Sequence, residues 1–175
     1  MRRLRYGVAV SLDGFIAGPD GEYDWIVHDP AIDFAAMFAE YDTLLMGRKT
    51  YEVAREEGKS WDSFGQRWIV VSTTLKAEDH PAVTILSSGI EEAVAAMKGE
   101  PGRDIWLFGG GVLFRAMLDA GLVDTVEVAL MPVMLGSGVP LLPQGRRRTL
   151  RLERSKALTS GIVMLSYSIP AEPAE

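Results

Sequence analysis

The chain has 175 residues, of which 47% are hydrophobic and 24% are charged, and this composition excludes disordered and fibrous proteins. We expect one domain over residues 1–175, because a chain of this length buries a substantial core without the help of disulfides or bound metals. It has no cysteine, two histidines and a net charge of −6. We therefore expect no disulfide, no metal site and no nucleic-acid partner.

No apolar stretch approaches the length of a membrane span, and residues 1–5 lead directly into strand-like sequence. We therefore expect a cytoplasmic protein with no membrane partner.

Residues 4–10 have the composition of a buried strand, and a turn-rich loop with Asp13-Gly14 and residues 18–21 follows them. This loop is the segment that we expect to move. Asp29 and Pro30 then have the pattern of a helix cap followed by proline at the first helical position. That helix would end near Tyr41, and its apolar face would comprise Ile32, Phe34, Ala35, Phe38 and Ala39.

Three strands are each followed by a turn and a predicted helix, which indicates an α/β fold with a mostly parallel sheet. The first strand, residues 43–46, leads through Gly47 into a helix that begins at Arg48. The second, residues 68–71, ends in Ser72-Thr73-Thr74 and precedes an amphipathic helix over residues 90–97. The third, residues 105–108, breaks into Gly109-Gly110-Gly111 before helical spacing resumes at Val112.

The C-terminal part of the chain is strand-like at residues 125–131, 149–157 and 162–169, with no helix between these segments. We expect them to add antiparallel at one edge. The sheet would then be mixed, with helices on both of its faces.

The turns after the three strands carry groups suited to an anion, and open α/β sheets bind ligands at the carboxyl ends of their strands. Arg48, Lys49 and Thr50 offer cations and a hydroxyl, Ser72 and Thr73 offer hydroxyls, and the glycine turn offers backbone N–H groups. Because cations at a helix N-terminus oppose the helix dipole, an anion between them is favoured, and we predict a phosphorylated dinucleotide. The alternatives are that both cations point into water and that the glycines serve turn geometry alone.

These junctions follow the segment Val8-Ala9-Val10-Ser11-Leu12-Asp13-Gly14-Phe15-Ile16-Ala17, and together they resemble the dihydrofolate reductase superfamily over nearly the whole chain. Residues 11–14, 47–52 and 129–138 are most similar to the C-terminal reductase domain of the bifunctional deaminase-reductase of riboflavin biosynthesis. The resemblance implies a three-layer, dihydrofolate-reductase-like fold. It also implies an NADPH-dependent reductase like 5-amino-6-(5-phosphoribosylamino)uracil reductase, acting on a pyrimidine- or pteridine-linked small molecule. A deaminase activity is not expected, because its zinc chemistry needs cysteine ligands.

The resemblance also implies which residues hold NADPH. Arg48 or Lys49 beside the 2′-phosphate would favour NADPH over NADH. The implied positions are Ala9 and Ile16 at the nicotinamide; Gly47, Arg48, Lys49 and Thr50 at the phosphates; Val71, Ser72 and Thr73 at the adenosine; and Gly109, Gly110, Gly111, Val112 and Leu113 at the pyrophosphate.

On the substrate side, the resemblance implies a carboxylate on the first helix, and Asp33 is the catalytic candidate, with Asp29 competing for the role. Trp25 would border the substrate or else plug the core. Asp13 would contact the substrate or else bond the backbone of its own loop. The chain departs from folate reductases at Ala129, where they usually have threonine. It departs from riboflavin-pathway reductases near the end of the first helix, where Phe38 would give an apolar wall in place of their usual arginine.

Two other functions stay open. A folate reductase would need Asp33 or Asp29 in the pocket, whereas a non-catalytic nucleotide-binding domain would fit the loss of the substrate arginine. The resemblance also predicts a homodimer, since similar reductases pair through sheet edges and exposed edges need protection.

Overall fold

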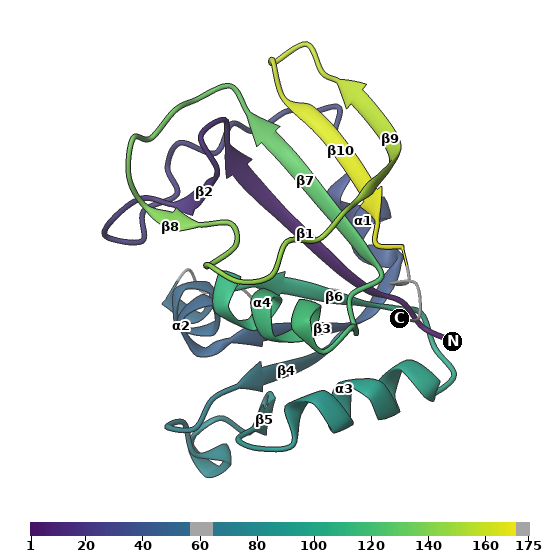
Figure 1. Cartoon of the computed structure of the whole chain (residues 1–175). Coiled ribbons are helices and arrows are strands. Elements are labelled where there is room, and N and C mark those ends of the chain that lie inside the picture. Colours follow the sequence, from purple (N-terminus) through teal and green to yellow (C-terminus); the bar gives the residue numbers. More distant parts are fainter. Residues whose placement is uncertain (57–64, 171–175) are drawn as a thin grey trace.

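The computed structural model describes residues 1–56 and 65–170 and is built on one eight-stranded sheet (Figure 1). The strands lie in the order β5-β4-β3-β6-β1-β7-β10-β9. Neighbouring strands are parallel from β5 to β7, and β10 is antiparallel to both of its neighbours, which confirms the predicted mixed sheet. The strands are β1 (Leu4–Ser11), β3 (Tyr41–Gly47), β4 (Arg67–Val71), β5 (Thr84–Leu86), β6 (Asp104–Gly109), β7 (Thr125–Met131), β9 (Arg151–Ala157) and β10 (Val163–Ser168).

One strand of the C-terminal part runs in the direction opposite to the predicted one. The sequence predicts that residues 125–131 add antiparallel, but β7 pairs in parallel with β1 from Arg5 and Thr125 to Ser11 and Met131. The reason is helix α4 (Gly111–Asp119), which lies between β6 and β7 in the chain. This crossover helix lets β7 begin at the same end of the sheet as β6, so that the two strands run in the same direction. Only β10 and β9 form the antiparallel edge.

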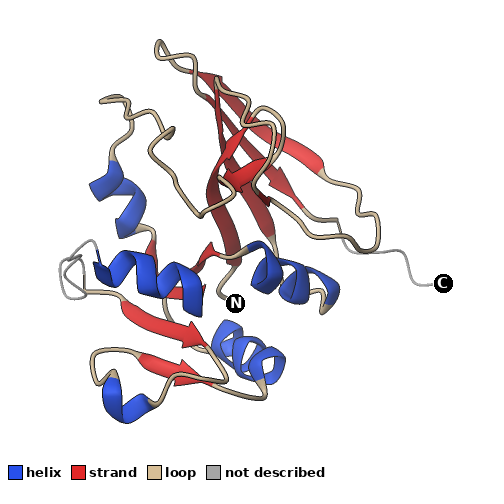
Figure 2. Cartoon of the chain, turned by 90° about the vertical axis from the view of Figure 1, so that its left-hand side faces the viewer, coloured by secondary structure: helices blue, strands red, loops and turns tan. Residues whose placement is uncertain are grey.

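Helices lie on both sides of the sheet (Figure 2). Helix α3 (Ile90–Gly99) and α4 contribute Val94, Met97, Phe114 and Met117 to the larger core. Helix α1 (Phe34–Ala39) and α2 (Arg48–Glu56) contribute Met37, Phe38 and Tyr51 to a second core on the other face, around Trp106. The resulting three layers agree with the predicted dihydrofolate-reductase-like architecture. A short 3-10 helix covers Ala77–Asp79.

The first helix begins later than the sequence predicts. Asp33, in extended conformation, is the N-cap, and its carboxylate accepts the Ala36 N–H at 2.9 Å. Asp29 instead accepts the Ala31 N–H at 2.8 Å, and the Ile32 N–H donates to the Asp29 carbonyl at 3.0 Å, so this segment is a separate turn. Tyr41, predicted to end the helix, is the first residue of β3.

A two-stranded sheet, β2 (Phe15–Ala17) with β8 (Val139–Pro140), joins the loop after β1 to the segment after β7. The predicted mobile loop therefore contains a paired strand. Within the described residues, the helices all fall short of the length and apolarity needed to cross a membrane.

Candidate functional site

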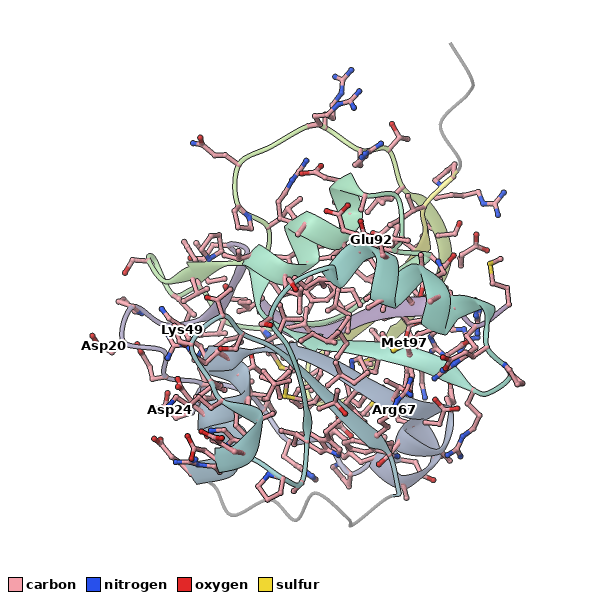
Figure 3. All side chains as sticks on the ribbon, turned by 90° about the horizontal axis from the view of Figure 1, so that it is seen from below. Asp20, Asp24, Lys49, Arg67, Glu92 and Met97 are labelled. Atoms are coloured by element: carbon pink, nitrogen blue, oxygen red, sulfur yellow. The ribbon has the colours of Figure 1, made fainter. Side chains whose placement is uncertain are left out.

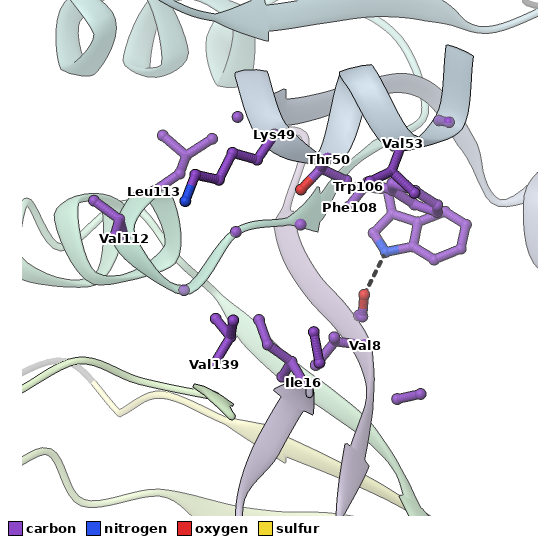
Figure 4. Close-up of a pocket in the computed structure, with 18 of the residues that line it drawn as sticks. Val8, Ile16, Lys49, Thr50, Val53, Trp106, Phe108, Val112, Leu113 and Val139 are labelled. Carbon is purple, nitrogen blue, oxygen red and sulfur yellow. Dashed lines mark hydrogen bonds between the residues drawn. The ribbon is translucent and has the colours of Figure 1, made fainter. Parts of the chain in front are cut away.

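A cleft of about 1390 Å³ opens where β1 and β6 separate. The two strands pair only as far as Tyr6 and Leu107, whereas β1 stays paired with β7 up to Ser11. At the point of separation the Trp106 indole N–H donates to the Gly7 carbonyl at 3.0 Å (Figure 4). Because β1 lies between β6 and β7, this is the kind of crevice in which open α/β sheets bind ligands.

The glycine turn lies at one wall of this cleft, and each of its glycines has a geometric cause. A Cβ on Gly109 would lie 2.8 Å from Cγ2 of Thr50, and one on Gly111 would lie 2.8 Å from the Pro140 carbonyl oxygen. Gly110 has φ +94°, a conformation that other residues rarely adopt. Turn geometry, the alternative raised by the sequence, thus accounts for the presence of the three glycines. It does not account for the position of this turn at the wall of a cleft.

The first turn of α4 supplies the donors that an anion needs. Gly110 is its N-cap and provides no side-chain hydrogen bond, so no cap side chain competes for the N–H groups at the helix start. These N–H groups and the positive end of the helix dipole favour phosphate or carboxylate groups. Gly111, Val112 and Leu113 all line the cleft.

Two cations at the start of α2 line the cleft, and they differ in whether a carboxylate of the described residues already pairs with them. Arg48 forms an ion pair with Glu52, one turn later, at 2.8 Å. Lys49 is exposed and forms no ion pair with any residue that the structure describes, and its side chain extends into the cleft towards Leu113 (Figure 4). Seen from below, Lys49 lies on the same side of the molecule as Asp20 and Asp24 of the loop after β2 (Figure 3). Lys49 is therefore the cation best placed to meet an entering anion.

The structure brings most of the predicted cofactor residues to this one cleft. Ser72 and Thr73 do not line it, and the Ser72 hydroxyl instead accepts the N–H of Leu75 at 3.0 Å. The predicted cofactor residues that do line it are Ala9, Ile16, Gly47, Arg48, Lys49, Thr50, Val71, Gly109, Gly110, Gly111, Val112 and Leu113.

We call the part of this cleft that lies on the α1 side of the sheet the inner chamber. Its floor consists of residues that share one sheet face, because Gly7 pairs with Glu127, Ala9 with Ala129, and Ala129 with Met164. The inner chamber is lined by Gly7, Ala9, Phe34, Met37, Tyr41, Trp106, Phe108, Glu127, Ala129 and Met164.

Neither carboxylate predicted for the substrate side lines the cleft. Asp33 is exposed and caps α1, as described above. Asp29 is buried outside the cleft, and hydrogen bonds from Ser160 and from the Ala31 N–H hold the pKa of its carboxyl below the usual value. The folate-reductase alternative required one of these two groups in the pocket, so it gains no support from this helix.

The three other predicted substrate residues also lie outside the cleft lining. The Trp25 indole N–H donates to the Glu22 carbonyl at 3.2 Å, within its own loop. Phe38 packs against Trp106 with ring centroids 5.1 Å apart, and Phe34 and Met37 of the same helix form the apolar wall instead. Asp13 accepts the N–H groups of Leu135 and Gly136 at 3.1 and 2.7 Å, so it joins two loops. Trp61, for which the sequence favours a core or interface position over a place in the site, lies outside the described residues.

Sequence reasoning missed Glu127 and Tyr41 in the inner chamber, and Glu91 and Glu92 at the start of α3. The signal for Glu127 was present, since a glutamate interrupts an otherwise apolar strand between Val126 and Val128. The two glutamates of α3 follow Gly89 in a first helical turn. Carboxylates are common there because the helix dipole stabilises them, so the sequence gives no sign that these two line a cleft.

Comparison with known proteins gives consistent matches along the chain. The family model of the RibD C-terminal domain matches residues 2–164. The uncharacterized protein YyaP of Bacillus subtilis (strain 168) is 34% identical over 178 residues, which covers 95% of this chain and 94% of YyaP.

Two solved structures share the fold. A Shewanella sp. PV-4 protein provisionally assigned to riboflavin biosynthesis has a TM-score of 0.83 at 23% identity, covering 97% of this chain and 99% of that one. A diaminohydroxyphosphoribosylaminopyrimidine deaminase/5-amino-6-(5-phosphoribosylamino)uracil reductase of Thermotoga maritima has a TM-score of 0.73 at 16% identity. The match covers 97% of this chain but only 57% of the Thermotoga chain.

Proposed function

Because the chain belongs to the RibD C-terminal domain family, we propose that it is an NADPH-dependent reductase that transfers a hydride to a pyrimidine- or pteridine-linked substrate. The observation that carries the proposal is the meeting of three features in one cleft. These are the start of α4, which has no side-chain cap, the cation Lys49, which forms no ion pair with the described residues, and the separation of β1 from β6.

The donors in the cleft fit a dinucleotide phosphate. The N–H groups of the glycine turn and of the first turn of α4 would hold the pyrophosphate. Lys49 would pair with a further phosphate, and Val71 at the end of β4 would pack against the adenine. Ala9 and Ile16 would hold the nicotinamide, which when bound supplies the hydride.

The chain's own task is to orient the substrate and exclude water. Ala9 lines both the nicotinamide end of the cleft and the floor of the inner chamber, so the two sites share a boundary. Residues Tyr23, Ile26 and Val27 of the loop between β2 and α1 also line the cleft and would cover the substrate. A covered, apolar chamber strengthens the polar contacts made within it and protects the hydride transfer from solvent.

Titration of the purified protein with NADPH and with NADH, followed by nucleotide fluorescence, tests the cofactor assignment. We expect NADPH to bind at least about tenfold more tightly, because an ammonium forms charge-assisted hydrogen bonds with a 2′-phosphate that NADH lacks. Absence of binding by both nucleotides would remove the proposed function.

The same preparation separates a reductase from a non-catalytic nucleotide-binding domain. We expect NADPH to be oxidised when pyrimidine and pteridine substrates are added. A protein that binds NADPH tightly but does not oxidise it with any of these substrates would be a non-catalytic binding domain.

A further inference from the structure

The inner chamber has small side chains on its floor and aromatic rings on one wall. Its floor carries small side chains where β1 and β7 pair, namely Gly7, Ala9 and Ala129. Trp106 and Phe108 form one wall, with ring centroids 4.9 Å apart and planes at 77°. Small side chains below and aromatic rings beside the space admit a planar heterocycle.

The charges around the cleft are unevenly distributed. Glu127 is the only charged side chain among the described residues that line the inner chamber. The Tyr41 hydroxyl donates to Oε2 of Glu127 at 3.5 Å. The other charged residues of the cleft lining belong to the first turns of α2 and α3, at the cofactor end: Arg48, Lys49, Glu91 and Glu92.

Arg5, the cation behind Glu127, has its donors engaged by protein carboxylates. Its Nε and Nη2 donate to the two oxygens of Glu127 at 2.8 and 2.9 Å. Its Nη1 donates to Glu40 and, at 3.4 Å, to Asp104. Arg5 is 9% exposed and lies 4.7 Å from the centre of the Tyr41 ring. This guanidinium therefore holds Glu127 in place and is not available to bind a substrate phosphate.

The group as a whole has an excess of negative charge. Asp104 also pairs with Arg3 at 2.6 Å, so three carboxylates, Glu127, Glu40 and Asp104, face two guanidinium groups. Among the residues that the structure describes, a phosphate in the inner chamber would meet a carboxylate with no free cation beside it. Ring N–H groups, or a protonated ring, would instead meet the carboxylate oxygens of Glu127, which they would share with Arg5, Tyr41 and the Thr125 hydroxyl, whose Oγ1 donates to Oε1 at 3.2 Å.

We propose that the inner chamber binds a flat nitrogen heterocycle without a phosphate group, and that Glu127 selects this substrate through its N–H donors. The inference rests on the proposed reductase function and narrows its substrate class. It places Glu127, and not a carboxylate of α1, as the group that determines specificity. It also separates this chain from a reductase acting on a phosphoribosylamino-pyrimidine.

Calorimetric titration of the full chain, with and without saturating NADP⁺, provides the test. The two probes are 2,4-diaminopteridine, which is flat and rich in N–H donors, and 5-amino-6-(5-phosphoribosylamino)uracil. We expect diaminopteridine to bind at least about tenfold more tightly than the phosphorylated probe. Equal or tighter binding of the phosphorylated probe, or no binding of diaminopteridine, would overturn the inference.

Two amide variants test the role of Glu127. Glu127→Gln should weaken diaminopteridine binding about tenfold or more, because the negative charge is lost and one acceptor oxygen is replaced by an NH2 donor. Glu153→Gln on the exposed strand β9 makes the same chemical change away from the cleft and should bind as the parent does. An unchanged affinity in Glu127→Gln would overturn the role of this residue.

A parallel titration with NADPH distinguishes this inference from the proposed function. If NADPH binds to the parent but the phosphorylated probe is preferred, the reductase proposal stands and the inference fails. If NADPH does not bind while diaminopteridine binds in a Glu127-dependent way, the inner chamber is assigned correctly and the reductase proposal fails.

Discussion

The hydroxyl of Tyr6 is buried in the core without a hydrogen-bond partner among the described residues. The ring stacks on Phe114 with centroids 3.8 Å apart, and burial raises the pKa of the hydroxyl. Tyr6→Phe removes the desolvated hydroxyl and keeps the stacking. We expect the free energy of unfolding in urea to rise by about 1 kcal/mol.

Tyr51→Phe is the matched control, because the Tyr51 hydroxyl lies 2.8 Å from Nδ1 of His80. The same chemical change should there lower the free energy of unfolding by about 1 kcal/mol. A loss of stability in Tyr6→Phe would contradict the assignment of an unsatisfied hydroxyl.

Asp13 links the loop after β1 to the loop after β7 by accepting the N–H groups of Leu135 and Gly136. A hydrogen bond from Ser11 and these N–H groups lower the pKa of Asp13 to about 2. The pKa in the unfolded chain is about 4, so the stabilisation is complete above that pH and is lost as the pH falls from about 4 to 2.

Asp13→Asn should therefore be less stable than the parent at neutral pH, with a gap that narrows as the pH falls through this range. Urea unfolding of both proteins at a series of pH values measures the gap. A gap that stays constant down to pH of about 2 would show that the charge of Asp13 contributes nothing.

At the scale of elements, the sequence predicts the strand-turn-helix units well because their signals are local. The sequence places the start of α1 too early because Asp29 and Asp33 both have the pattern of an N-cap, and the Ala36 N–H donates to Asp33. The inner chamber depends on which residues pair between β1, β7 and β10. That register is set by contacts between segments far apart in the chain, so neither Glu127 nor Tyr41 could be assigned from spacing.

The first turn of α2 should contribute to NADPH binding mainly through Lys49. Arg48 is already paired with Glu52, whereas Lys49 has no such partner among the described residues. We expect Lys49→Ala to weaken NADPH binding about tenfold and Arg48→Ala to weaken it less. Lys156→Ala on β9 is the control, and fluorescence titration measures all three variants. A larger effect for Arg48→Ala would reverse the assignment.

At the scale of the whole molecule, the order of the strands creates the site. The first strand of the chain lies between two strands from its second half, β6 and β7, and remains paired along its length with β7 only. The cleft therefore exists only once distant parts of the chain have assembled. Substitutions that weaken the β1–β7 pairing should consequently impair binding and stability together.

The exposed edge of the sheet supports the proposal that two copies of the chain pair. Strand β9 ends the sheet, all of its residues are exposed, and Leu152 is 52% exposed. An unpaired edge with an apolar side chain is a surface that another copy can cover. We expect twice the mass of one chain in sedimentation at micromolar concentration, and dissociation in Leu152→Glu. Leu12→Glu, which changes another exposed leucine away from β9, should remain dimeric. If the parent sediments as a single chain, the edge is protected by its own charged residues, Arg151, Arg154 and Lys156, and the dimer proposal fails.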